Sequence, residues 1–209
     1  MSGIVVFVHG LWLSGLEAIV LRRRVAAALG FAERNFGYPS MSATLGDSAA
    51  ALGVYLRAMD ADTLHLIGHS MGGLVILKLF EDPPALPAGR IVLLGTPIQG
   101  SSAAVGLARL PGGKRLLGRA MAQAMTPAKP CRWQAPRDIG IIAGDSPYGL
   151  GRLVARLDGP NDGIVLVEET RLAGATDRIV LSAQHAGLLY SRAAARQTAA
   201  FLAHGRFAR

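Results

Sequence analysis

The sequence has few of the features that mark secreted or membrane proteins. Its 209 residues include one cysteine, Cys131, and no apolar stretch approaches the roughly 20 residues that span a bilayer. A single cysteine cannot form a disulfide within the chain, as is usual in a reducing compartment. The N-terminal sequence MSGIVVFVHG lacks the basic start and the small-residue cleavage site of a secretory signal, and we expect its apolar run to be a core strand. These absences predict a cytoplasmic protein.

The sequence also lacks the patterns of nucleic-acid and nucleotide binding. Its 22 Lys and Arg residues exceed 14 Asp and Glu, which gives a net charge of +8 and would suit nucleic acid or an anionic membrane surface. The basic residues are mostly arginines spread along the chain, without a patch that includes aromatic residues. The phosphate-binding patterns G-x-x-x-x-G-K-[ST] and G-x-G-x-x-G are absent. We therefore expect no nucleic-acid partner.

Internal repeats and low-complexity tracts are absent as well, and the length fits a single domain over residues 1–209. Short apolar runs alternate with longer segments rich in alanine and leucine. The helix expected first carries a capping-box pattern, Ser14 with Glu17, and ends at Gly30. This alternation predicts an α/β fold with a mostly parallel sheet and right-handed crossovers. We expect strands at 3–10, 34–38, 63–68, 90–95, 138–144 and 177–182, and helices at 14–30, 47–60, 73–82 and 192–205.

The segment LHLIGHSMGGLVILKLF, residues 64–80, places Ser70 between an expected strand and an expected helix. Gly68-x-Ser70-x-Gly72 in that position is the pattern of a nucleophile elbow, a turn too tight for side chains two residues before and after the serine. The alternatives are a glycine-rich turn with an incidental serine or a phosphate cradle. Because the strand and helix flanks are both present and the phosphate patterns are not, we predict that Ser70 is a nucleophile.

A serine hydroxyl needs a base to remove its proton, and the chain offers five histidines. His185 follows the last expected strand and precedes a glycine and a helix, so it should emerge at the same edge of the sheet as the serine. His69 should point away from its neighbour and pack below the turn, whereas His65 lies within a strand and His204 within the last helix. His9 comes too early for the order serine, acid, histidine. We predict that His185 is the base.

The base needs an acid that sets its tautomer, and three aspartates precede His185 after the strand at 138–144. Asp145 directly follows that strand, a position that often supplies the acid. Asp162 lies in an Asn-Asp-Gly turn that would hold a carboxylate rigidly, and Asp158 could simply begin this turn. The residues alone leave these alternatives open.

An oxyanion hole needs two backbone N–H donors near the nucleophile. The residue after the serine, Met71, should supply one of them. The loop after the first strand should supply the other through Leu11, because the preceding Gly10 lets the backbone pass close to a substrate. The alternative for this glycine is an ordinary strand end.

Together these motifs resemble the α/β-hydrolase family, and in particular its compact bacterial lipases and esterases. FVHGL, GHSMGG, LLGTPIQGS, NDGIV and HAGLLYS occur in the family's order and span residues 7 to 191. The resemblance implies an α/β-hydrolase fold in a minimal form, with helices on both faces of the sheet. It also implies that the aspartate of the NDG turn, Asp162, is the acid, and that neither a cofactor nor a metal is needed.

The function predicted from this reasoning is hydrolysis of carboxylic esters, with an acyl or lipid ester as substrate. A thioesterase or an acyltransferase would use the same catalytic triad. The alternative from another class is a non-catalytic binding protein with the same fold.

Residues 99–137 lie outside the alternation and are expected to form a small cap-like insertion. Helical spacing predicts a broad apolar side, which would be either ordinary core or an acyl-pocket wall over Ser70. Basic residues nearby would favour contact with an anionic lipid surface. The expected apolar residues are Leu107, Leu110, Leu116, Leu117, Met121, Ala124 and Met125, the basic ones are Lys114, Arg115 and Arg119, and the breaks are Pro111, Gly112, Gly113, Gly118, Pro127 and Pro130.

Overall fold

The computed structural model describes residues 2–125 and 131–209, and its centre is a six-stranded sheet in the order β2-β1-β3-β4-β5-β6. Every pairing of neighbouring strands in the described sheet is parallel. This confirms the predicted fold class. The strands are β1 (Gly3–Val8), β2 (Ala32–Phe36), β3 (Thr63–His69), β4 (Ile91–Leu94), β5 (Ile139–Gly144) and β6 (Asp177–Leu181).

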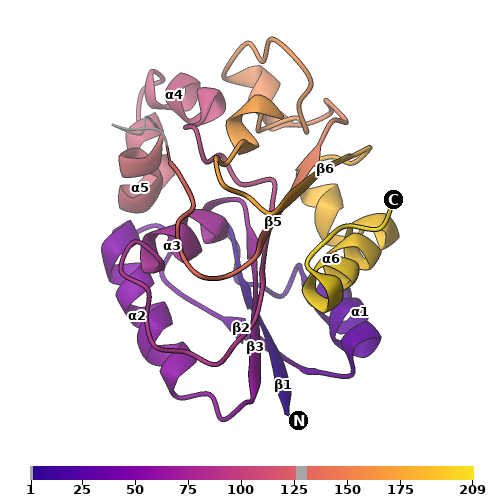
Figure 1. The fold of residues 1–209 in the computed structure, drawn as a ribbon. Coiled ribbons are helices and arrows are strands. Elements are labelled where there is room, and N and C mark those ends of the chain that lie inside the picture. The colour runs from indigo at the N-terminus through magenta and orange to yellow at the C-terminus, as the bar shows by residue number, and fades with distance from the viewer. Residues whose placement is uncertain (1, 126–130) are drawn as a thin grey trace.

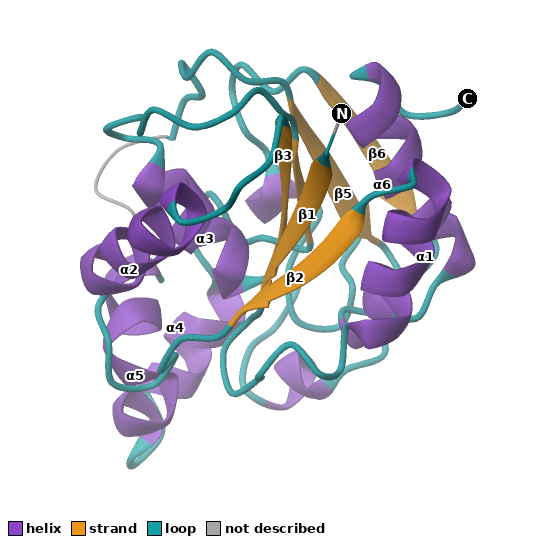
Figure 2. Ribbon diagram, turned by 90° about the horizontal axis from the view of Figure 1, so that it is seen from below, coloured by secondary structure: helices purple, strands orange, loops and turns teal. Residues whose placement is uncertain are grey.

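Helices cover both faces of the sheet (Figures 1 and 2). On one face lie α1 (Ile19–Leu29) and α6 (Arg192–His204), and on the other lie α2 (Leu45–Arg57) and α3 (Met71–Leu79). Side chains of β1 alternate between the two layers, since Val6 and Val8 pack with α2 and α3 whereas Val5 and Phe7 pack with α1 and α6. Burial on both faces explains why β1, β4 and β5 are continuously apolar, whereas the edge strand β2 contains Glu33, Arg34 and Asn35.

The first helix begins later than expected, at Ile19 instead of residue 14. The Glu17 carboxylate accepts hydrogen bonds from the backbone N–H groups of Ser14 and Gly15, so this pair closes a turn ahead of the helix. The helix ends as expected, because Gly30 adopts φ 68° and donates its N–H to the last turn. Strand β2, in contrast, begins earlier than expected, at residue 32 instead of residue 34.

The segment 99–137 contains two helices, α4 (Ser102–Ala108) and α5 (Gly113–Ala124), and Gly118 interrupts α5 with φ 67° and ψ 178°. The expected single apolar side is divided. Leu117 and Met121 are buried in the core, whereas Leu110 and Leu116 are 48% and 52% exposed. Two of the expected breaks, Pro127 and Pro130, lie outside the described residues.

Three short 3₁₀ helices complete the described part of the chain: η1 (Leu150–Leu153), η2 (Glu168–Thr170) and η3 (Ala186–Leu189). The first two belong to the long connection from β5 to β6. Within residues 2–125 and 131–209, no helix combines the length and apolar character required to cross a bilayer.

Candidate active site

Ser70 lies between β3 and α3 in a strained turn, with φ 53° and ψ −125°. A positive φ is rare for a residue with a side chain and is typical of the nucleophile elbow. A Cβ atom at Gly68 would lie 2.6 Å from Gly73 Cα, and one at Gly72 would lie 2.1 Å from the Val8 carbonyl oxygen. Both positions therefore exclude a side chain, as the sequence pattern predicts.

His185 and Asp162 form a hydrogen-bonded pair, with 2.7 Å between His185 Nδ1 and Asp162 Oδ2. The Asp162 side chain is buried, and its other oxygen accepts the backbone N–H groups of Ile164 and Val165 at 3.0 and 2.7 Å. An ionised carboxylate can only accept, so Nδ1 of the histidine carries the proton. The lone pair is then on Nε2, where a general base needs it.

The Asn-Asp-Gly turn holds this carboxylate in place. Asn161 Oδ1 accepts the N–H of Gly163 at 3.0 Å, and Gly163 adopts φ 91°. The backbone of the turn is also tied to the base, because the His185 N–H donates to the Asp162 carbonyl oxygen at 2.8 Å. Asp162 and His185 are thus linked through their side chains and through the backbone.

The other two candidate acids lie elsewhere. Asp145 is exposed, and its backbone N–H donates to the Leu181 carbonyl oxygen. Asp158 forms an exposed ion pair with Arg156 at 2.8 Å. Of the three aspartates, the structure pairs Asp162 with His185.

The serine and the His185–Asp162 pair meet at the end of β4. The Ser70 N–H donates to the Leu94 carbonyl oxygen at 2.9 Å. A Cβ atom at the next residue, Gly95, would lie 3.0 Å from His185 Nδ1 and 3.1 Å from Asp162 Oδ2. Ser70 Oγ has no hydrogen-bond partner among the described residues, so the hydroxyl is free to rotate towards a base or a bound substrate.

The two expected oxyanion donors flank the serine. Met71 is the first residue of α3, so its N–H has no acceptor within the helix. The N–H of Leu11 likewise donates to no other group in the described part of the chain. Gly10 brings the Leu11 loop close, because a Cβ atom there would lie 3.1 Å from Ser70 Cβ.

His9 and Tyr38 fix the direction of this loop. The rings stack with 4.4 Å between centroids, His9 Nε2 accepts the Tyr38 N–H, and His9 Nδ1 donates to the Gly10 carbonyl oxygen at 2.8 Å. The Tyr38 hydroxyl donates to the His9 carbonyl oxygen at 2.8 Å. In a trans peptide the C=O and N–H groups point in opposite directions, so holding the Gly10 carbonyl also orients the Leu11 N–H. Burial lowers the pKa of His9, which keeps this arrangement neutral.

His69 contacts the loop that carries the base. It is buried as expected, but its Nε2 also donates to the His185 carbonyl oxygen at 3.2 Å, and the two rings lie 4.8 Å apart. Burial, with a smaller contribution from the charge of His185, lowers the pKa of His69 to about 3. His69 therefore places no second positive charge beside a protonated base.

Helix α5 is attached to the loops that follow β1 and β2. Trp12, one of two described non-glycine residues with positive φ, donates its indole N–H to the Leu116 carbonyl oxygen at 2.9 Å. The N–H of Arg119 donates to the Met41 carbonyl oxygen at 3.2 Å. Sequence reasoning missed both Trp12 and Tyr38, because these partners are far apart along the chain. Groups of three or more potential metal-binding side chains are absent from the described residues.

The strained serine beside a buried His–Asp pair, at the carboxyl edge of a parallel sheet, matches the fold that the motifs resemble. The sequence model of the "Alpha/beta hydrolase family" matches residues 5–207. The chain belongs to this family. A search among curated proteins finds no significant match.

Similar solved structures are bacterial and metagenomic lipases and esterases. The mature lipase BlEst2 of Bacillus licheniformis has a TM-score of 0.75 and 19% identity, with 97% of this chain and 91% of that chain covered. The metagenomic carboxyl esterase MGS0156 has a TM-score of 0.63 and 18% identity, with 87% and 64% covered. Carboxylesterase CesB of Bacillus subtilis has a TM-score of 0.57 and 13% identity, with 98% and 84% covered. At these sequence identities the comparison shows a shared fold and nothing more.

Proposed function

We propose that this α/β-hydrolase is a serine esterase that cleaves carboxylic esters through an acyl-enzyme. Ser70 Oγ attacks the ester carbonyl carbon while His185 Nε2 takes the hydroxyl proton. The tetrahedral intermediate collapses, and His185 returns the proton to the departing alcohol. Water, activated by the same histidine, then attacks the acyl-enzyme and releases the carboxylic acid.

The observation that carries this proposal is the 2.7 Å hydrogen bond between His185 Nδ1 and buried Asp162. It fixes the tautomer that leaves Nε2 unprotonated, and it stabilises the imidazolium that forms when the proton arrives. The N–H groups of Leu11 and Met71 would bind the oxyanion. Two such donors supply several kcal/mol, since loss of one typically costs about 10²- to 10³-fold in rate.

A lipid substrate is favoured by exposed apolar residues in segments at the carboxyl edge of the sheet, the edge that carries the candidate site. Trp12 and Leu16 lie in the loop directly after β1, and Tyr148 lies in the loop after β5; all three are exposed. Figure 1 shows α4, α5 and the β5–β6 connection gathered at this end of the sheet. In the segment of α4 and α5, Leu110 and Leu116 are exposed as well.

Charge at the same edge supports contact with an anionic membrane surface. Helix α5 carries three exposed basic residues beside the exposed Leu116. These residues, which we call the α5 cations, are Lys114, Arg115 and Arg119. Cations next to exposed apolar side chains are typical of segments that bind lipid surfaces peripherally. We therefore propose that the protein takes acyl esters from, or close to, an anionic lipid surface.

Hydrolysis of p-nitrophenyl butyrate by the wild-type protein and by Ser70→Ala tests the proposed reaction. The variant should lose activity by at least about 10⁴-fold, with little change in the thermal unfolding midpoint. Activity that survives the substitution would contradict the proposed nucleophile. Matched oxygen and sulfur esters of one acyl group would show whether an esterase or a thioesterase is the better description.

A further inference from the structure

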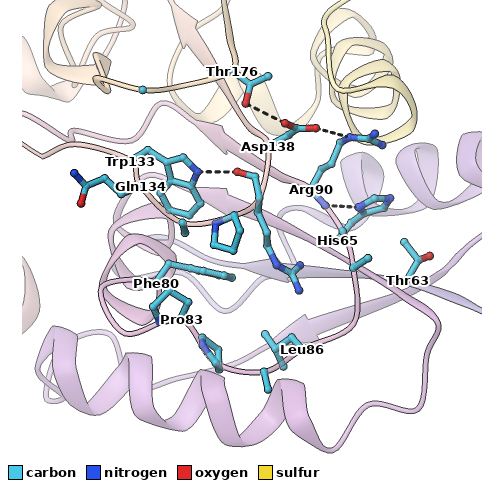
Figure 3. Close-up of a pocket in the computed structure, with 18 residues that line it drawn as sticks. Thr63, His65, Phe80, Pro83, Leu86, Arg90, Trp133, Gln134, Asp138 and Thr176 are labelled. Atoms are coloured by element: carbon cyan, nitrogen blue, oxygen red, sulfur yellow. Dashed lines mark hydrogen bonds and ion pairs between the residues drawn. The ribbon is translucent and has the colours of Figure 1, made fainter.

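A cleft, drawn in Figure 3, is lined by residues at the amino ends of the strands, whereas Ser70 lies at a carboxyl end. Its residues include Thr63, the first residue of β3, whereas Ser70 directly follows the last residue of that strand. At about 3.3 Å per residue the two positions are roughly 20 Å apart. Arg90, Asp138 and Thr176, which immediately precede β4, β5 and β6, also line the cleft. It is therefore separate from the candidate active site.

The cleft has a mixed lining, with polar side chains on one part and aromatic and proline residues on another. Phe80 and Trp133 lie with ring centroids 5.5 Å apart, and the Trp133 indole N–H is held by the Arg137 carbonyl oxygen at 2.7 Å. Three prolines line the same space, where their fixed φ limits the backbone and they add no N–H donor. The volume of about 910 Å³ lies in the range of small-molecule sites, about 300 to 1,000 Å³. The prolines are Pro83, Pro84 and Pro136.

Arg137 places a positive charge in this cleft. Its guanidinium lies 5.5 Å from the centroid of the Phe80 ring, and it donates to the carbonyl oxygens of Leu64 and Pro87. A guanidinium has five N–H donors, so these two anchors orient the group and leave three N–H groups without an acceptor among the described residues. Across residues 2–125 and 131–209, no carboxylate forms an ion pair with Arg137. Its charge is therefore not neutralised locally.

The other ionisable groups of the cleft do not supply a counter-charge. Arg90 and Asp138 pair with each other at 3.1 Å, and Asp138 also accepts the Thr176 hydroxyl (Figure 3). His65 is buried and accepts the Arg90 N–H at Nδ1, so its remaining nitrogen carries the proton of a neutral ring. Burial and the charges of both arginines lower the pKa of His65 to about 4. The cleft thus carries about one net positive charge beside the aromatic and proline residues of its lining.

We propose that this cleft binds an organic carboxylate, with the carboxylate on Arg137 and an apolar body against Trp133 and Phe80. A carboxylate matches the fork of a guanidinium, and its charge-assisted hydrogen bonds are about twice as strong as neutral ones. The apolar body replaces water on the aromatic and proline walls. Because the walls are rigid, little conformational entropy is lost when the ligand binds. The proposal does not depend on the reaction at Ser70.

The two tryptophans of the chain allow the two ends of the sheet to be observed separately. Trp133 lies in the cleft, whereas Trp12 lies in the oxyanion loop and is 58% exposed. In a Trp12→Phe protein, 4-phenylbutyrate should change the Trp133 fluorescence with saturation. The neutral amide of the same acid should bind at least about tenfold more weakly, the lower limit expected for losing one charge-assisted interaction.

Variants near Arg137 complete the test. Arg137→Gln should weaken 4-phenylbutyrate binding at least about tenfold, but it also removes two anchors of the backbone and could unfold the cleft. Ala88→Glu avoids this problem, because Ala88 is exposed, lines the cleft and lies next to Pro87, which Arg137 contacts. The new carboxylate should compete for the guanidinium and weaken binding, whereas the matched neutral variant Ala88→Gln should bind as the parent does. Thermal unfolding would verify that each variant is folded.

Three results would overturn the proposal. The first is no saturable change of Trp133 fluorescence up to about 10 mM 4-phenylbutyrate, which is weaker than typical small-molecule binding. The second is equal affinity for the acid and its amide. The third is a signal confined to the reciprocal Trp133→Phe protein, which would place the ligand beside Trp12 at the catalytic edge.

Discussion

Replacing Asp162 by asparagine should inactivate the enzyme while preserving its fold, because the turn dictates how the new amide is oriented. Asp162 Oδ1 accepts two backbone N–H groups, and Oδ2 accepts His185 Nδ1–H. In Asp162→Asn the amide oxygen must stay at the Oδ1 position. The opposite orientation would leave the buried N–H of Val165 and the partly buried N–H of Ile164 facing an NH₂ group, at about 1–3 kcal/mol for the buried one.

The amide nitrogen then faces His185, and the consequence is a change of tautomer. An amide nitrogen only donates, so His185 Nδ1 must become the acceptor and its proton moves to Nε2. That nitrogen can no longer take the proton of Ser70. The expected loss in kcat is about 10⁴-fold, which corresponds to about 5 kcal/mol of transition-state stabilisation.

Steady-state hydrolysis of p-nitrophenyl butyrate measures the effect, with Asp145→Asn as the matched control. Asp145 is exposed, so its substitution should leave kcat within about twofold of wild type, as is usual for a surface position. Both variants should unfold at nearly the wild-type temperature. If Asp162→Asn kept more than a tenth of the activity, or if Asp145→Asn lost more, the assignment of the acid would be wrong.

Three further predictions concern acid stability, the elbow and the insertion. Burial lowers the pKa of His65 to about 4 and that of His69 to about 3, so below about pH 6.5 the unfolded chain binds protons that the folded protein does not. The free energy of unfolding should therefore decrease as the pH is lowered through that window, by up to about 1.4 kcal/mol per pH unit for each histidine. Urea titrations that show a constant value from pH 7 to 4 would contradict this. Gly72→Ala should lower the free energy of unfolding by at least about 2 kcal/mol because its Cβ would collide with backbone, whereas Gly46→Ala, with no atom closer than 3.8 Å, should not destabilise the protein. Reversing the charges of the α5 cations should reduce activity on anionic lipid dispersions and spare soluble short-chain esters; an equal effect on both substrates would remove the proposed surface contact.

The central strands could be predicted from the sequence because they are buried on both faces. β1 and β5 are short continuous apolar runs that end at turn residues, as is typical of buried parallel strands. The start of α1 could not be predicted, since the Ser14–Glu17 pattern is the same whether the carboxylate caps a helix or closes a loop. The carboxylate accepts the Ser14 N–H in both cases, and the difference is that Ser14 Oγ accepts the N–H of Leu16 instead of that of Glu17, which the sequence does not specify.

The candidate site, too, could be predicted from the sequence in some of its residues and not in others. Ser70 could be predicted because the two glycines that its tight turn requires, Gly68 and Gly72, lie next to it in a recognisable spacing, between an apolar run that predicts a strand and one that predicts a helix. The choice of Asp162 needed the resemblance to a known family, because three aspartates satisfied the order along the chain. The stacking of His9 on Tyr38 and the cleft around Arg137 could not be predicted, since their residues come from separate segments that only the folded chain brings together.

Labelling with a fluorophosphonate probe tests the central claim, an activated serine at position 70, most directly. The probe reacts with a serine whose proton is removed by a neighbouring base, and no knowledge of the natural substrate is needed. We expect one covalent adduct per chain, located on Ser70 by mass spectrometry of peptides, no adduct in Ser70→Ala, and much slower labelling in His185→Ala. A folded wild-type protein that stays unlabelled, or an adduct that persists in Ser70→Ala, would contradict the account.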